Sequence, residues 1–209
     1  MIRAWLQSVG LGLAVAACAG TPLRTPQTDV VVPQTFVVVV RHAEKAPTPV
    51  NDPELSAAGT SRAAALNGTL ADQPVHDVVV SHLQRTRLTA ADLIARTSPV
   101  VHVVPIGAAG TAAHIQAVAD TVRAIARRRG RGGILVVGHS NTVTQIVGAL
   151  GVPEPAPLCD SQYSQLFRVT LGASGASSGG ASLTRSTYGA ADAPDATCQQ
   201  SLPGMLGRP

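Results

Sequence analysis

The sequence predicts an α/β protein: a three-layer α/β/α sandwich with a mostly parallel central sheet and an antiparallel hairpin at the sheet edge. Two observations predict this fold class. From residue 36 onward, short runs of β-branched residues alternate with longer segments of helical spacing, a pattern typical of parallel strands covered by helices on both faces. Near the end, two strand-like runs flank a loop rich in Gly and Ser, which is typical of a hairpin.

The elements are expected in the following order. Each of the four parallel strands is a continuous apolar run, as for strands buried on both faces, and they lie at 36–40, 78–80, 100–104 and 134–137. Helices are expected at 56–71, 84–96, 111–129 and 141–151. The first helix can begin at Ser56 and the third can be capped by Thr111. The hairpin strands are expected at 165–171 and 181–189, around the loop 172–180.

The composition fits one globular domain and excludes a disordered chain. Of the 209 residues, 45% are apolar, 13% are charged and only 2% are aromatic, so we expect a core of Val, Ala, Leu and Ile. The formal net charge is +4, and the densest basic run lies at 127–131. Because no aromatic residues are interleaved with it, we interpret this run as a helix C-terminus ended by Gly130, and we expect no nucleic-acid partner.

The N-terminal residues 1–17 are typical of a lipoprotein signal peptide. Arg3 supplies a positive start, and the apolar stretch at 9–17 is too short to span a bilayer. The sequence Val-Ala-Ala-Cys at 15–18 resembles the bacterial lipobox, in which Cys18 is lipidated and becomes the mature N-terminus. An ordinary secretory peptide with an incidental cysteine is the alternative. We therefore expect an exported protein that is either lipid-anchored on the periplasmic side of the cell envelope, touching the membrane only through its lipid, or secreted.

After the signal peptide we expect a flexible tether at 18–35, one domain at 36–188 and a C-terminal tail at 189–209. Export bears on the two remaining cysteines, Cys159 and Cys198. An oxidising compartment permits a disulfide between them, which would stabilise the fold by roughly 3–4 kcal/mol. Two unpaired thiols are the alternative.

Cationic and titratable residues directly follow three of the predicted parallel strands. Arg41 and His42 follow the first strand, Ser81 and Arg85 follow the second, and His139 follows the fourth. Because the carboxyl ends of parallel strands share one edge of a sheet, we expect these side chains to converge. Arginine forks match the oxygens of a phosphoryl group, so the cluster predicts a site for a phosphorylated ligand.

These motifs resemble the histidine phosphatase superfamily, also called phosphoglycerate-mutase-like. The resemblance covers about residues 36–188 and rests on four matches: Arg41-His42 in "VVVVRHAEK", "LSAAG" at 55–59, Arg85 with Thr89-Ala90 in "SHLQRTRLTA", and Gly138-His139-Ser140 in "VVGHSNT". It implies that His42 is a nucleophile that forms a phosphohistidine, which water then hydrolyses. It implies that Arg41, Arg85 and His139 hold the equatorial oxygens of the phosphoryl group.

The resemblance further implies a small phosphorylated substrate and no cofactor. We expect no metal, because the histidines lack paired ligand spacing. His76, His82 and His102 are expected to be structural.

One part of the family pattern is missing. Many relatives place a Glu or Asp after the third parallel strand to protonate the leaving oxygen. Here His114 is the only titratable residue after that strand before Asp120, so it either replaces the acid or occupies an exposed first turn of a helix. Weaker candidates on the loop after the first strand are Glu44, Asp52 and Glu54. Without an acid, substrates with good leaving groups, such as phosphohistidine or phosphoanhydrides, would be preferred.

Three functions other than a phosphatase can be compared with the sequence. A serine hydrolase is excluded, because "GHSNT" has Thr142 where the nucleophile elbow has its second glycine, and no histidine follows His139. A mutase usually requires a larger cap than these loops provide. An exported lipoprotein that binds phosphorylated ligands with little or no turnover stays open as the alternative to an enzyme.

Overall fold

The computed structural model describes residues 34–172 and 180–195, and its centre is a six-stranded sheet in the order β3-β2-β4-β1-β5-β6. The strands are β1 (Thr35–Arg41), β2 (Val75–Val80), β3 (Val100–Val103), β4 (Gly132–Gly138), β5 (Gln165–Thr170) and β6 (Ser182–Thr187). The first four strands are parallel to one another, β5 is antiparallel to β1, and β6 is antiparallel to β5. The predicted edge hairpin is therefore confirmed.

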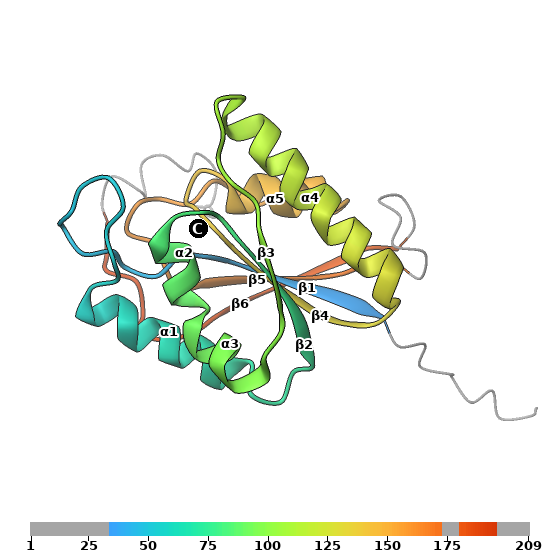
Figure 1. Ribbon diagram of the computed structural model, residues 1–209, viewed down its shortest axis with the longest axis horizontal. Helices are drawn as coiled ribbons and strands as arrows, with labels where there is room; N and C mark the ends of the chain where they lie inside the picture. The colour runs from blue at the N-terminus through green and yellow to red at the C-terminus, as the bar shows by residue number, and fades with distance from the viewer. Residues whose placement is uncertain (1–33, 173–179, 196–209) are drawn as a thin grey trace, which may run out of the picture. The chain divides into compact units, whose positions relative to one another are not determined.

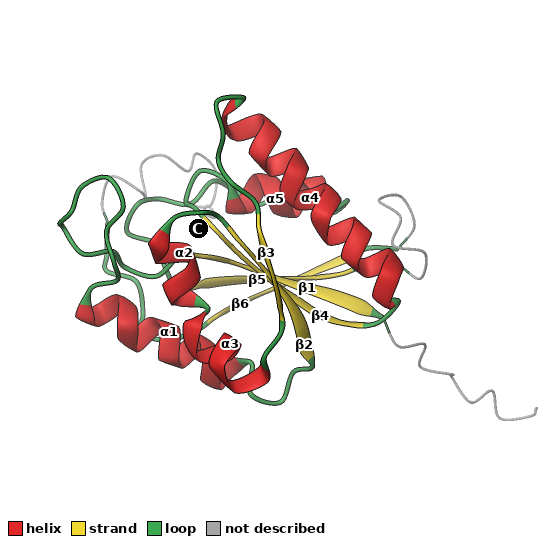
Figure 2. Cartoon of the chain, in the orientation of Figure 1, coloured by secondary structure: helices red, strands yellow, loops and turns green. Residues whose placement is uncertain are grey.

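Helices cover both faces of the sheet (Figures 1 and 2). They are α1 (Ala57–Thr69), α2 (Gln84–Thr89), α3 (Ala91–Thr97), α4 (Gly110–Arg129) and α5 (Val143–Ala149). The helices α4 and α5 lie on one face, and α1, α2 and α3 lie on the other. This arrangement confirms the predicted three-layer α/β/α sandwich.

The valine run of β1 shows why the central strands lack polar alternation. Val37 and Val39 pack in the core beneath α4 and α5, whereas Val38 and Val40 pack beneath α1 and α3. Because successive side chains of a strand point to opposite faces, a strand between two helical layers needs an apolar residue at every position. All four valines are fully buried.

Two predicted elements differ from the structure. The run at 100–104 is not buried on both faces, because β3 is an edge strand, and Val100 and Val103 are 48% and 53% exposed. The single helix predicted at 84–96 is two helices that meet at Ala90. At the break, the Thr89 hydroxyl donates to the Arg85 carbonyl and accepts from the Ala43 N–H, which ties the end of α2 to the loop after β1.

The ends of two further helices can be compared with their predicted caps. Ser56 caps α1 as predicted, with its hydroxyl accepting from the Gly59 N–H at 3.1 Å. Thr111 does not cap α4, which begins one residue earlier at Gly110. The C-terminus of α4 carries the basic run, and Gly130 follows with a φ of 71°, in the left-handed region that favours glycine.

Several predictions concern residues outside the described part. They concern the signal peptide, Cys18, nearly all of the tether, Cys198 and most of the C-terminal tail. All of these stay predictions. Cys159 is disulfide-bonded, and because Cys198 is not described, the pairing between these two residues stays a prediction. None of the helices within the described residues is long and apolar enough to cross a bilayer.

Candidate active site

A cavity of about 430 Å³ lies at the carboxyl end of the parallel strands. The sequence-predicted site residues that line it are Arg41, His42, Arg85, His114 and His139. They come from the end of β1 and the residue after it, from α2, from α4 and from the loop after β4. The structure thus brings all five together, although they are far apart along the chain.

The pairing of β1 with β4 places the two central histidines side by side. Arg41 is aligned with Gly138 in the parallel register, and the His42 N–H donates to the Gly138 carbonyl at 2.9 Å. A histidine directly follows each of these two strands, and the ring centroids of His42 and His139 are 5.3 Å apart. A Cβ atom on Gly138 would lie 3.0 Å from the side chains of Thr142 and Val143, so this position favours glycine where the chain turns into α5.

His42 is held as a neutral imidazole with one reactive nitrogen. Its Nδ1 lies 2.8 Å from the Ala43 carbonyl oxygen, and because a carbonyl can only accept, Nδ1 carries the proton and Nε2 keeps its lone pair. Burial, followed by the positive charges of Arg41, Arg85 and Lys45, lowers the pKa of His42 to about 3. Its nucleophilic form is therefore the resident form at neutral pH.

Arg41 is fixed by the segment that precedes β5. Its Nη1 donates to three carbonyl oxygens, those of Cys159, Asp160 and Gln162, at 2.9–3.1 Å. Its guanidinium also lies 3.9 Å from the ring centroid of Tyr163, a cation–π contact. These contacts orient the guanidinium fork at the wall of the cavity.

The two arginines keep donors that no described residue accepts. The Nε atoms of Arg41 and Arg85 are buried and have no hydrogen-bond partner among the described residues. Burial also lowers the pKa of both guanidiniums, as expected for cations that lack full compensation. An oxyanion in the cavity would supply both the acceptors and the negative charge.

His139 is buried opposite His42. Its Nε2 lies 3.2 Å from the Ser81 hydroxyl, which is in turn 3.0 Å from the Thr86 hydroxyl. Burial, followed by the electrostatic interactions with His42 and Arg85, lowers the pKa of His139 to about 3. A phosphoryl dianion beside this ring would raise its pKa, because an opposite charge favours the protonated form.

His114 is not an exposed residue of the first helical turn, which was one of its two predicted readings. It is 4% exposed and its side chain lines the cavity. Its Nδ1 lies 3.3 Å from the Pro105 carbonyl oxygen, which leaves Nε2 without the proton in the neutral ring. Burial is the main cause that lowers its pKa, and the negative charge of a bound phosphoryl group would favour the protonated ring.

The alternative carboxylates of the loop after β1 are engaged elsewhere. Glu44 forms an ion pair with Arg62 at 2.8 Å, and Asp52 accepts from the Gln84 N–H at the start of α2 at 2.8 Å. Glu54 lies beside a separate small cavity near Leu88. Of the four acid candidates, His114 alone is among the residues that line the site.

The "LSAAG" motif has a structural role next to the site. A Cβ atom on Gly59 would lie 2.1 Å from the Glu44 carbonyl oxygen, so only glycine allows α1 to approach the loop after β1 this closely. That loop is also closed by the Ser56 N–H, which donates to the same Glu44 carbonyl at 2.9 Å. The motif therefore holds the segment that follows His42.

Among the lining residues that sequence reasoning did not assign to the site, Lys45, Asp160 and Tyr163 carry a charge or an aromatic ring. Tyr163 could have been found from the sequence, because it precedes the antiparallel strand β5. The amino end of β5 meets the carboxyl ends of the parallel strands. Residues just before a predicted antiparallel edge strand therefore belong to the same rim. Asp160 has a side chain that is 95% exposed, with its Oδ1 3.7 Å from Arg41 Nη2.

The remaining histidines are not among the residues that line the cavity. His82 Nδ1 accepts from the Ile106 N–H at 3.3 Å, and His102 Nε2 lies 2.8 Å from Asp77. Within residues 34–172 and 180–195, no group of three or more His, Cys, Asp or Glu side chains could hold a metal ion.

Comparisons with known proteins agree with the predicted family. The family model of the histidine phosphatase superfamily (branch 1) matches residues 37–108. This segment runs from β1 through the end of β3 and includes both cavity arginines. No curated protein matches the chain by sequence.

Solved structures share the fold at low sequence identity. The protein histidine phosphatase SixA complexed with tungstate is 19% identical, with a TM-score of 0.56 over 73% of this chain and 96% of that one. The SixA protein from Nakamurella multipartitia is 22% identical, with a TM-score of 0.56 over 75% of this chain and 97% of its own. A mycobacterial glucosyl-3-phosphoglycerate phosphatase is 17% identical, with a TM-score of 0.53 over 75% of this chain and 99% of that one.

The sequence match covers the first half of the domain, and the shared fold covers about three quarters of the chain. Together they support the predicted resemblance to the histidine phosphatase superfamily over part of the sequence and show a fold shared with solved phosphatases.

Proposed function

We propose that this protein is a phosphatase that hydrolyses phosphomonoesters, or phosphohistidine and phosphoanhydrides, through a phosphohistidine on His42. One observation carries the proposal: His42 presents an unprotonated Nε2, because its Nδ1 lies 2.8 Å from a backbone carbonyl oxygen and its pKa is lowered to about 3. A side chain that only bound phosphate would need a donor here, and this nitrogen is an acceptor.

The reaction proceeds in two displacements at phosphorus. In the first, the lone pair of His42 Nε2 forms an N–P bond while the bond to the leaving oxygen breaks. In the second, water attacks phosphorus, the N–P bond breaks, and inorganic phosphate leaves with His42 again neutral. Charge on the three equatorial oxygens grows in both transition states, where Arg41, Arg85 and His139 donate hydrogen bonds.

The leaving oxygen must take up a proton in the first displacement. We assign this proton to His114, whose burial in the cavity wall supports the role. Burial lowers the pKa of this ring, and a bound phosphoryl group would raise it again because an opposite charge favours the protonated form. The proposal therefore favours substrates with good leaving groups, for which this proton matters least. The relative SixA is described as a protein histidine phosphatase complexed with tungstate, which agrees with an oxyanion ligand and with a labile phosphoryl donor.

The test is to trap the intermediate on the full chain. After mixing with radiolabelled aryl phosphate and quenching in alkali, the wild type should carry a phosphoryl group that acid removes, as a phosphohistidine does. His42→Asn keeps a donor for the Ala43 carbonyl and should lose both the label and about three orders of magnitude or more of turnover. The matched control is His76→Asn, an exposed histidine outside the site, which should leave both unchanged.

Two results would contradict the proposal. Retained label in His42→Asn would remove His42 as the nucleophile. A wild type that binds inorganic phosphate but turns over no ester in a substrate panel would favour the exported phosphate-ligand binding lipoprotein instead.

A further inference from the structure

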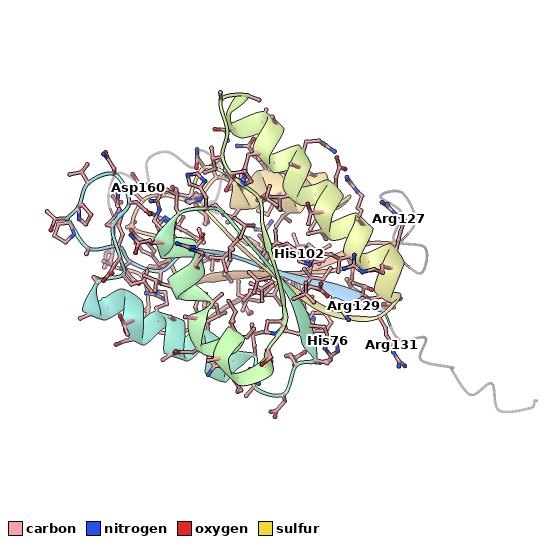
Figure 3. The ribbon with its side chains drawn as sticks, in the orientation of Figure 1. His76, His102, Arg127, Arg129, Arg131 and Asp160 are labelled. Carbon is pink, nitrogen blue, oxygen red and sulfur yellow. The ribbon has the colours of Figure 1, made fainter. Side chains whose placement is uncertain are left out.

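A second group of arginine and histidine side chains lies at the amino end of the sheet, away from the candidate active site. It surrounds a cavity of about 770 Å³, and we call its members His76, His102, Arg128, Arg129 and Arg131 the basic patch. Figure 3 shows Arg129, Arg131 and His76 at one end of the domain and Asp160, of the active-site rim, at the other.

The basic patch is built around one buried carboxylate. Asp77 on β2 is fully buried, and it accepts from Arg129 Nε and lies 2.8 Å from His102 Nε2. Arg128 Nη2 is 3.6 Å from the same carboxylate. Asp77 thus orders the inner members of the patch but cannot balance three arginines. With one carboxylate against three arginines, the patch and its anchor together keep a net positive charge.

The outer members of the patch face solvent. The side chain of Arg128 is 59% exposed, and Arg131 is also exposed. Val100, which lines the same cavity from the edge strand β3, is 48% exposed. Cations beside an exposed apolar side chain match the headgroup region of a bilayer, where phosphates lie above acyl chains.

The chain enters the domain beside this patch. β1 begins at Thr35, which is aligned with Gly132 in the parallel register, and Arg131 directly precedes Gly132. The predicted tether at 18–35 therefore joins the domain next to the basic patch. A tether of about 17 residues extends no more than about 60 Å, so a lipid on Cys18 would limit how far from the membrane this end of the domain can move.

We propose that the basic patch docks the domain on the anionic headgroups of the membrane that holds its N-terminus. Each arginine near an anionic bilayer strengthens binding about fivefold. Docking by the amino end of the sheet turns the carboxyl end, with the catalytic cavity, away from the bilayer. The site then faces soluble substrates, and its own cations stay out of reach of lipid phosphates.

The experiment uses the full chain with Cys18→Ser, so that no lipid masks the effect of the patch. Binding to vesicles of phosphatidylcholine alone is compared with binding to vesicles that contain about one third phosphatidylglycerol. The test variant, Arg128→Gln with Arg131→Gln, leaves the Arg129 contact with Asp77 in place. The matched control, Arg87→Gln with Arg185→Gln, removes the same charge from exposed positions elsewhere. The N-terminal segment is identical in all three proteins.

We expect binding only to the anionic vesicles, an affinity about 25-fold lower in the test variant, and a change within about twofold in the control. Hydrolysis of a soluble aryl phosphate should be equal in all variants. Equal binding to both vesicle types, or equal loss in the test and control variants, would overturn the proposal. So would displacement from vesicles by millimolar inorganic phosphate, which indicates a small-anion site, or tighter binding to duplex DNA than to vesicles.

Discussion

The two ends of the central sheet both gather arginine and histidine, yet they differ in burial and in pairing. At the carboxyl end, Arg41 and His42 are 4% and 5% exposed, and two arginine Nε donors lack partners among the described residues. At the amino end, Arg129 and His102 are engaged by the buried Asp77, and Arg128 is mostly exposed. Cationic composition alone therefore does not make a catalytic site.

The two ends differ in whether buried guanidinium groups have all of their N–H donors paired. A desolvated guanidinium beside a neutral imidazole interacts strongly with an incoming oxyanion, because no water screens the pair. An exposed arginine near its own carboxylate gains little from the same ion. We expect substitutions at the carboxyl end to change catalysis, and matched substitutions at the amino end to leave it unchanged.

The largest effect in this comparison is expected at the arginines. Arg41→Gln should lower kcat/KM for an aryl phosphate by about 10²–10³-fold, because one preorganised donor set for the transition-state oxygens is lost. Arg128→Gln at the other end should change kcat/KM less than twofold. Thermal melting of both variants separates catalysis from folding, and similar losses in the two variants would remove the distinction between the ends.

The next effect distinguishes His114 from a merely structural residue. His114→Asn keeps a donor for the Pro105 carbonyl but removes the second ring nitrogen. We expect kcat for an alkyl phosphate to fall about 100-fold, and kcat for 4-nitrophenyl phosphate to fall less than about threefold. His76→Asn should change neither rate. An equal loss with both esters would show that His114 does not protonate the leaving oxygen.

The smallest effect concerns the pH dependence of stability. In the folded protein the pKa values of His42 and His139 lie at about 3, well below the usual 6.5. Between those values the unfolded chain binds more protons, so stability falls as the pH is lowered. From pH 7 to pH 5 the free energy of unfolding should drop by about 2 kcal/mol for each of these histidines.

Denaturant titrations at pH 7 and pH 5 measure this drop. His42→Asn should show a drop about 2 kcal/mol smaller than the wild type, whereas His76→Asn, at the amino end, should match the wild type. An unchanged drop in His42→Asn would mean that the folded protein already holds His42 protonated at pH 5.

Much of the fold was accessible from local patterns. Continuous valine runs such as the one in β1 predict strands buried between two helical layers, and Ser56 predicts the start of α1. The error at β3 is instructive, because its valines have the same pattern as those of β1 although β3 lies at the sheet edge. Local sequence encodes apolar periodicity, whereas strand order decides what covers each face.

The residues of the candidate site also divide into those that local patterns revealed and those that only the folded chain brings together. The residues that directly follow parallel strands, such as Arg41 and His139, could be found because parallel strands end at a common edge. Tyr163 and Asp160 reach the same cavity from the antiparallel side, and no motif marked them. Asp77 lies just before the strand expected at 78–80 and no motif marked it, but it is the buried carboxylate at the centre of the basic patch.

Sequence alone determined the succession of strands and helices along the chain. It also placed the cations and histidines at the strand ends, because these features depend on periodicity and on chain direction. Only the tertiary structure decided the tautomer of His42, the burial of His114, the carbonyl oxygens that hold Arg41, and the separation of the two cationic ends. These features arise from contacts between segments more than a hundred residues apart in the case of Arg41, and from exclusion of water by the packed layers, neither of which is encoded in any single stretch of chain.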